Sequence, residues 1–263
     1  MALDGKSNFF YITKSLVTRE IATKYRGSTV GAAWIFLQPI LMLVIYTFVF
    51  GSILQAKWGV KSTSHGEYAL ILFAGLIIFN FVSECLSKAP SVIISNTNYV
   101  KKVIFPLQLL PLVIVVSAFI NMVIAIGVWI LFYILLVGLP PLTVLFLPAI
   151  LIPIALLTYG VTSFLAAVGV YFRDVNQFLG VFLTGLMFIS PIFYPIQVLP
   201  KDIASYIYLN PLTIPVDQLR SALYWGVAPN PESYFIYLFA SILLAFLGHK
   251  FFLKTKVGFS DVI

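Results

Sequence analysis

Residues 103–172 read VIFPLQLLPLVIVVSAFINMVIAIGVWILFYILLVGLPPLTVLFLPAILIPIALLTYGVTSFLAAVGVYF, and these 70 residues include no Asp, Glu, Lys or Arg. A helix needs about 20 mainly apolar residues to cross a lipid bilayer. The run is long enough for two such helices, and the breaker cluster Gly138-Leu139-Pro140-Pro141 separates them. This stretch therefore predicts a helical hairpin inside a membrane.

The rest of the chain has the same apolar character. Hydrophobic residues make up 61% of the sequence and charged residues 10%, whereas a soluble domain carries about 25% charged residues. Two further runs, Gly27–Ala56 and Val175–Pro200, also lack charged residues. The composition excludes an ordinary soluble domain and predicts an all-α integral membrane protein.

We expect six transmembrane helices within residues 34–253, at about Trp34–Leu54, Tyr68–Ser87, Leu107–Val137, Leu142–Tyr171, Val175–Tyr194 and Tyr234–Leu253. With this count, twelve of the sixteen Lys and Arg residues lie on the side of the two termini. Cytoplasmic loops are enriched in these residues, so both termini, including the tail 254–263, are predicted to be cytoplasmic. The same bias explains the net charge of +7 without nucleic-acid binding.

Two segments on the predicted cytoplasmic side are not spans. Residues 1–33 contain a basic stretch, Lys6–Arg26, which suits a helix lying at the membrane surface, although an ordinary basic flank would look similar. Residues 88–106 begin near Pro90 and end in a lysine pair, which suits a short helix on which a soluble partner docks. A solvated loop is the alternative reading of that segment.

On the opposite side, residues 196–226 are too apolar for a free loop. We expect two short helices, Pro200–Leu209 and Pro215–Gly226, each too short to cross the bilayer. They would re-enter the outer leaflet and cover the space between the spans. The alternative is an outer loop packed on the bundle.

Motifs for soluble chemistry are missing from the sequence. It has no phosphate-binding Gly-x-x-x-x-Gly-Lys-Ser/Thr loop, no Gly-x-Ser-x-Gly and no His-Glu-x-x-His. Its one cysteine, Cys85, and its two distant histidines offer no metal site. Glu84 is read as an interfacial carboxylate rather than a proton relay. This scarcity of buried charge disfavours an ion-coupled carrier and a membrane-embedded transferase.

Four stretches in order along the chain carry a resemblance. They are Arg19-Glu20-Ile21 with Lys24-Tyr25-Arg26-Gly27-Ser28, Tyr171-Phe172-Arg173-Asp174-Val175, Ser190-Pro191-Ile192-Phe193-Tyr194 and Leu209-Asn210-Pro211-Leu212. In these stretches the chain resembles the permease subunits of type-2 ATP-binding-cassette (ABC) exporters, which move O-antigen, capsule or teichoic acid. A type-2 ABC permease for a lipid or drug remains the alternative.

The resemblance implies a homodimeric channel in the bacterial inner membrane that exports a lipid-linked glycan, with O-antigen as the first candidate. Two separate ATPase subunits would bind ATP and magnesium, so this chain is expected to be no enzyme and to hold no cofactor or metal. The implied ATPase-coupling residues are Arg19, Asn96, Tyr99, Lys101 and Lys102. The implied outer-gate residues are Asn210, Pro211, Asp217 and Arg220, the last two forming a local ion pair by default. The expected aromatic channel residues are Tyr46, Phe48, Phe50, Phe188, Phe193 and Tyr194.

Overall fold

The computed structural model describes residues 5–53, 58, 65–101 and 105–262. Within these ranges the chain forms helices and turns and no strand, which confirms the predicted all-α class. The α-helices are α1 (Gly5–Lys24), α2 (Trp34–Tyr46), α3 (His65–Lys88), α4 (Thr97–Lys101), α5 (Leu109–Leu136), α6 (Leu147–Tyr171), α7 (Val175–Ile189), α8 (Lys201–Ile207), α9 (Thr213–Arg220), α10 (Pro231–Thr255) and α11 (Phe259–Val262).

Among the described residues, five helical stretches are long and apolar enough to cross a membrane. They are Gly31–Phe50, Gly66–Ser91, Leu109–Leu136, Leu142–Tyr171 and Pro231–Val262. The predicted fifth span corresponds to α7, which has 15 residues and ends before Ser190-Pro191. A helix of that length covers about 22 Å, less than the hydrocarbon core of about 30 Å. The total of six spans therefore stays a prediction.

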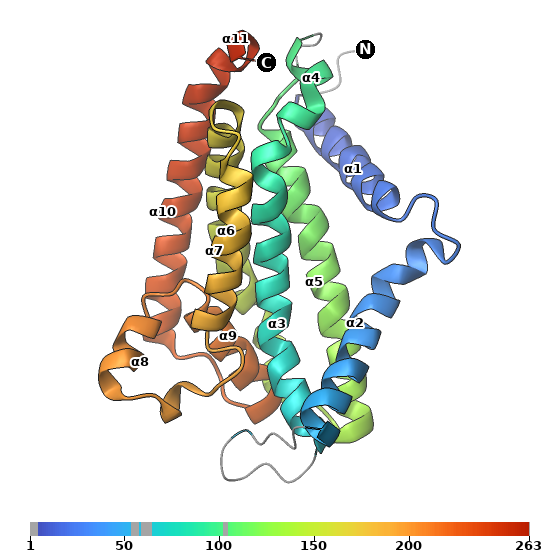
Figure 1. The fold of residues 1–263 in the computed structure, drawn as a ribbon, viewed down its shortest axis with the longest axis vertical. Coiled ribbons are helices and arrows are strands. Elements are labelled where there is room, and N and C mark those ends of the chain that lie inside the picture. The colour runs from blue at the N-terminus through green and yellow to red at the C-terminus, as the bar shows by residue number, and fades with distance from the viewer. Residues whose placement is uncertain (1–4, 54–57, 59–64, 102–104, 263) are drawn as a thin grey trace.

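The helices surround α3, which is flanked by α2 and α7 in Figure 1, with α5 behind it. In α3, 83% of the residues in the most apolar window are buried, against 6% in α2. Both termini lie at the same end of the bundle as α4, while α8 and α9 lie toward the other end (Figure 1). This arrangement agrees with termini that share one side of a membrane.

The helices α6 and α10 make a close contact through glycines. A Cβ atom added at Gly160 would overlap the backbone of α10 at Leu244, and one added at Gly248 would overlap the backbone at Gly160. Small residues at such crossings allow two membrane helices to approach closely. This contact fixes α10 against the rest of the bundle.

The link between α1 and α2 is a bend. Gly27 and Gly31 both adopt positive φ angles, +86° and +59°, a conformation that glycine tolerates at low cost. The Trp34 indole donates a hydrogen bond to the Ser28 hydroxyl at 2.9 Å and closes the turn. The bend lets α1 leave the line of α2 and lie against α5 (Figure 1).

The two segments predicted between spans differ in regularity. Residues 88–106 do not form one helix, because two short turns, Ala89–Ser91 and Ile94–Asn96, precede the five-residue α4. On the other side, α8 lies within the expected helix Pro200–Leu209, whereas α9 begins two residues before the expected start at Pro215. The turn that follows α9, Ser221–Trp225, ends at Gly226, which adopts a left-handed conformation with a φ of +66°. Most of α9 is buried against α3, α6 and α10.

Candidate functional site

One face of α3 carries polar side chains within an otherwise apolar helix. Asn80, Ser83, Glu84 and Ser87 follow the three- and four-residue spacing that places side chains on one helix face. Asn80 and Ser87 are exposed, although most of α3 is buried. Polar groups on a membrane helix normally face water or other polar groups and not lipid. This face of α3 is therefore suited to line a hydrated path.

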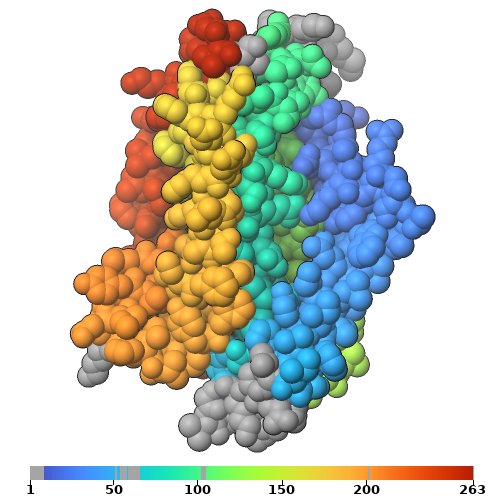
Figure 2. Space-filling model, viewed as in Figure 1, coloured from blue at the N-terminus to red at the C-terminus, as the bar shows by residue number. Residues whose placement is uncertain are grey.

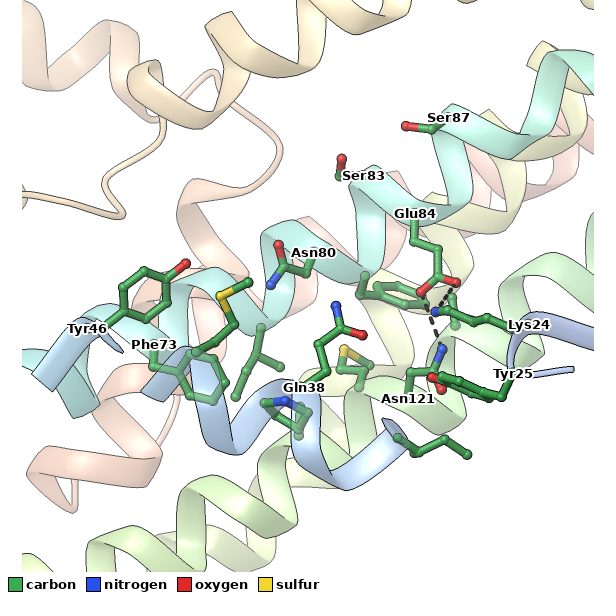
Figure 3. A pocket seen from close by; sticks show the side chains of 18 residues that line it. Lys24, Tyr25, Gln38, Tyr46, Phe73, Asn80, Ser83, Glu84, Ser87 and Asn121 are labelled. Carbon is green, nitrogen blue, oxygen red and sulfur yellow. Dashed lines mark hydrogen bonds and ion pairs between the residues drawn. The ribbon is translucent and has the colours of Figure 1, made fainter. Parts of the chain in front are cut away.

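The polar face borders a cleft of about 500 Å³ between α2, α3 and α5. In Figure 2 the surface is hollowed between α3 and the arm formed by α1 and α2. Figure 3 shows the amides of Gln38, Asn80 and Asn121 around the cleft, with Tyr46 at one end and Lys24 at the other. The buried Oδ1 of Asn121 has no hydrogen-bond partner within the described part of the chain.

A network of four charged side chains closes the cleft at the end near α1. Glu84 accepts hydrogen bonds from Lys24 at 2.9 Å and from Lys88 at 3.2 Å. Lys88 also pairs with Glu20 of α1 at 3.1 Å, and the Asn121 amide donates to Glu84 at 3.3 Å. The network pairs each charge and ties α1 to α3. The prediction that Glu84 is an interfacial carboxylate agrees with this arrangement.

Two of the predicted coupling residues meet in the structure. The Arg19 guanidinium of α1 donates a hydrogen bond to the Tyr99 hydroxyl of α4 at 2.8 Å, and the Tyr99 ring stacks on Phe105 at 4.4 Å between centroids. Asn96 instead donates to the Val92 carbonyl within its own segment. Lys101 ends α4, and Lys102 lies outside the described residues. A role of these residues in ATPase coupling stays a prediction.

The predicted outer-gate segments lie together. The Asn210 side-chain amide donates to the Ser190 hydroxyl at 2.9 Å, and its Oδ1 accepts from the Leu212 amide at 2.9 Å. Asn210 and Ser190 are both buried, whereas Pro211 is exposed. These bonds connect the end of α7 to the turn between α8 and α9.

Arg220 is the most connected polar residue at this end. Its guanidinium donates to the carbonyls of Ile71, Pro191 and Ile192, and it lies over the Trp58 ring at 4.5 Å from the centroid. Arg220 is 3% exposed. The local ion pair expected with Asp217 is therefore replaced by bonds to main-chain oxygens. Burial favours this arrangement, since a buried charge needs several polar partners.

The six predicted channel aromatics occupy different environments. Tyr46 lines the cleft, and Phe50 packs on Tyr68 at 5.4 Å between centroids. Phe48 and Phe188 are each 60% exposed. Phe193 stacks on Phe188 at 5.9 Å, and the Tyr194 hydroxyl donates to the Ile189 carbonyl at 2.8 Å. The structure thus gathers three of them at the end of α7, and a channel role for the six stays a prediction.

The sequence prediction overlooked most of the polar cleft. The spacing of Asn80, Ser83 and Ser87 within a predicted span was the signal that would have identified them. Gln38 and Asn121 carry no comparable signal, because they lie on different helices and join the site only through packing.

Comparison with known proteins agrees with this architecture. The family model of the ABC-2 type transporter matches residues 11–224. An O-antigen export system permease protein RfbA from Myxococcus xanthus is 31% identical over 111 residues, which cover 42% of this chain and 40% of that relative. A protein of the same name from Klebsiella pneumoniae is 26% identical over 115 residues, covering 43% of this chain and 42% of that relative.

The matched segments therefore span less than half of the length of either relative. The family match is broader, since it extends from α1 to the turn after α9 and includes both the cleft and the outer segment. On that match, the chain belongs to the ABC-2 type transporter family.

Proposed function

We propose that this chain is the membrane-spanning channel subunit of an ATP-driven exporter that moves a lipid-linked polysaccharide, O-antigen, across the inner membrane of a bacterium. Family membership supports transport, and the similarity to O-antigen export permeases supports the O-antigen substrate. The observation that carries the proposal is the polar face of α3 beside an amide-lined cleft, in a chain with few charged residues. A path for sugars needs such neutral hydrogen-bonding groups within the bilayer.

In this proposal two copies of the chain form the channel. Among the described candidate spans, the one that contains α2 is the least buried, and α2 exposes large apolar side chains, among them Phe36, Leu41, Val44 and Ile45. A second copy packed near α2 would cover these side chains and would set two polar α3 faces toward a shared path. The charge bias among the loops supports a cytoplasmic location for the termini and α4.

The proposal assigns ATP hydrolysis to two separate ATPase subunits at the end of the bundle that holds α4. They would hold ATP and magnesium, so this chain supplies no catalytic residue. Movement of a docked ATPase would reach α1 through the bond between Arg19 and Tyr99, and α3 through the pair of Lys88 and Glu20. The pair of Lys88 and Glu20 belongs to the charge network that closes the cleft, and Arg19 is the neighbour of Glu20 in α1, which suits a device that changes the width of the cleft.

The test is transport by the purified chain in proteoliposomes together with the ATPase subunit that co-purifies with it from the source cells. The lipid-linked polysaccharide of the source cells is loaded, and its arrival in the opposite leaflet is followed with ATP and with a non-hydrolysable analogue. Movement of glycan with ATP alone supports the proposal. Movement of lipid without its glycan would assign the chain to lipid transport, and movement driven by an ion gradient without ATP would make it a carrier. Either result overturns glycan export.

A further inference from the structure

A second cavity lies beside α9, toward the end of the bundle opposite the termini (Figure 1). It has a volume of about 380 Å³ and lies between the residues that follow α7 and the turn that follows α9. Trp225, Asp217 and Gln197 line it with exposed side chains. The cavity is distinct from the cleft between α2, α3 and α5, since the two share no lining residue.

The backbone around the cavity holds Trp225 in place. The turn Ser221–Trp225 continues α9 and ends at Gly226, and the Val227 amide donates to the Ser221 carbonyl at 2.9 Å. The Trp225 indole contacts the Tyr224 ring edge-on, with 5.4 Å between centroids. Trp225 still remains 44% exposed. A large aromatic surface is therefore presented to the cavity by a well-defined turn, which lowers the entropic cost of binding a ligand.

The polar groups beside the indole differ in what they can bind. The exposed Asp217 carboxylate offers only acceptors, and the Gln197 amide offers both donors and an acceptor. The charge of Arg220 is already directed to the main-chain carbonyls of Ile71, Pro191 and Ile192. Arg220 also lines the cavity, but it is buried and bonded to these carbonyls, so the exposed charged side chain is the Asp217 carboxylate, which disfavours anionic ligands.

These groups match the chemistry of a pyranose ring. Such a ring has an apolar C–H face that packs on an aromatic surface, and its edge carries hydroxyl groups that require hydrogen-bond partners once they are removed from water. Ligand sites typically combine an apolar wall with a few convergent polar groups in this way. Phosphate or lipid headgroups would need a free cationic group instead.

We propose that this cavity binds one pyranose unit of a neutral glycan, with the sugar face on Trp225 and its hydroxyls toward Asp217 and Gln197. The inference rests on the proposed function, because the glycan reaches this end of the bundle through export. The site would hold the emerging chain at the outer side and oppose its return. The competing role for Trp225 is that of an interfacial anchor among lipid headgroups.

The experiment is calorimetric titration of the purified full chain in lipid nanodiscs. The probe is a mixture of short neutral oligosaccharides, released by mild acid from the surface polysaccharide of the source cells. We compare the wild type with Trp225→Leu, which keeps an apolar side chain without a flat ring, and with Asp217→Asn. The matched control is Tyr206→Leu, because Tyr206 is an exposed aromatic residue of α8 that does not line the cavity.

We expect Trp225→Leu to weaken binding about fivefold to tenfold, from the loss of aromatic contact. Asp217→Asn should weaken binding about tenfold, from the loss of a charged acceptor. Tyr206→Leu should leave binding unchanged. Each variant is first checked by size-exclusion chromatography, and the isosteric Asp217→Asn keeps the test valid if Trp225→Leu does not fold.

Absence of binding by the wild type, or equal binding by the wild type and both cavity variants, would refute the site whatever the transport assay shows. Equal weakening by Tyr206→Leu would assign the effect to a general aromatic belt and would also refute it. If the wild type binds as expected but proteoliposomes show no ATP-driven export, the proposed function fails while the sugar site stands. The two proposals therefore fail by different measurements.

Discussion

The role of Arg220 can be tested through the glycine that it faces. Gly75 lies in α3, where a Cβ atom would come 2.6 Å from Nη2 of Arg220 and 3.1 Å from its Cζ. The guanidinium donates hydrogen bonds to the carbonyls of Ile71, Pro191 and Ile192, so it cannot move away from an added Cβ without losing some of them. Gly75→Ala should therefore destabilise the protein by displacing Arg220.

The expected loss of stability follows from the hydrogen bonds that the substitution would break. A hydrogen bond from a charged donor contributes about 1.5–3 kcal/mol, and the two bonds to Pro191 and Ile192, in the turn after α7, are the ones most dependent on Arg220. For Arg220→Leu, part of this loss is offset because burying leucine avoids the free-energy cost of transferring a charged guanidinium out of water. We expect a loss of about 2–4 kcal/mol for Arg220→Leu, and a similar loss for Gly75→Ala.

The double variant separates this mechanism from general strain. With leucine at position 220, the Cβ at position 75 no longer meets a guanidinium. Gly75→Ala should then be neutral, or stabilising by up to about 1 kcal/mol through its helix propensity. The coupling energy between the two substitutions should therefore be about 2 kcal/mol or more.

The assay is thermal unfolding of the purified chain in detergent, followed by tryptophan fluorescence. A loss of about 2–4 kcal/mol corresponds to a fall in melting temperature of about 5–10 °C for a chain of this size. Gly127→Ala in α5 is the control, since a Cβ there meets nothing within 4 Å. Equal destabilisation by Gly75→Ala with and without Arg220 would refute the reasoning.

Three further predictions concern the other contacts. Gly248→Ala should lower the melting temperature by about 5 °C or more, because its Cβ overlaps the backbone of Gly160 and overpacking costs about 1–3 kcal/mol or more. Tyr99→Phe should cost less than about 1 kcal/mol in stability, since an exposed contact is weak, but should reduce ATP-driven transport by removing the acceptor for Arg19. Asn80→Leu should leave the melting temperature within about 2 °C while lowering the transport rate several-fold, because Asn80 is exposed on the polar face of α3.

Each of these predictions has a matched control. Gly180→Ala tests a helical glycine at which a Cβ meets nothing within 4 Å, and a comparable fall in its melting temperature would contradict the close-contact argument. Tyr11→Phe alters an exposed tyrosine of α1, and equal loss of transport would remove the special role of Tyr99. Ile242→Leu alters an exposed apolar residue of α10, and an equal loss of transport would count against the polar path.

Much of the architecture was predictable from the sequence. The apolar runs predicted the helices, and the two short outer helices that were expected correspond to α8 and α9, although α9 begins two residues earlier than predicted. These features follow from length and composition, since the thickness of the hydrocarbon core sets how many apolar residues a span requires. The proline and glycine positions added the breaks between helices.

The sites were less predictable. Glu84 was expected to be an interfacial carboxylate, and only packing showed that Lys88 lies between it and Glu20. Arg220 was expected to bind Asp217, three residues away, but its partners lie 149, 29 and 28 residues away in sequence. Such partners depend on how each helix is rotated about its axis, which a nearly uniform apolar sequence does not encode.

By itself, then, the sequence determined that the chain is a bundle of membrane helices with its Lys and Arg residues mostly on one side. The tertiary structure decided that the polar face of α3 meets the amides of α2 and α5, and that Arg220 connects α9 to α3 and to the residues after α7. The physical reason is that insertion depends on the hydropathy of each segment alone, whereas helix pairing depends on the fit of side chains from different segments.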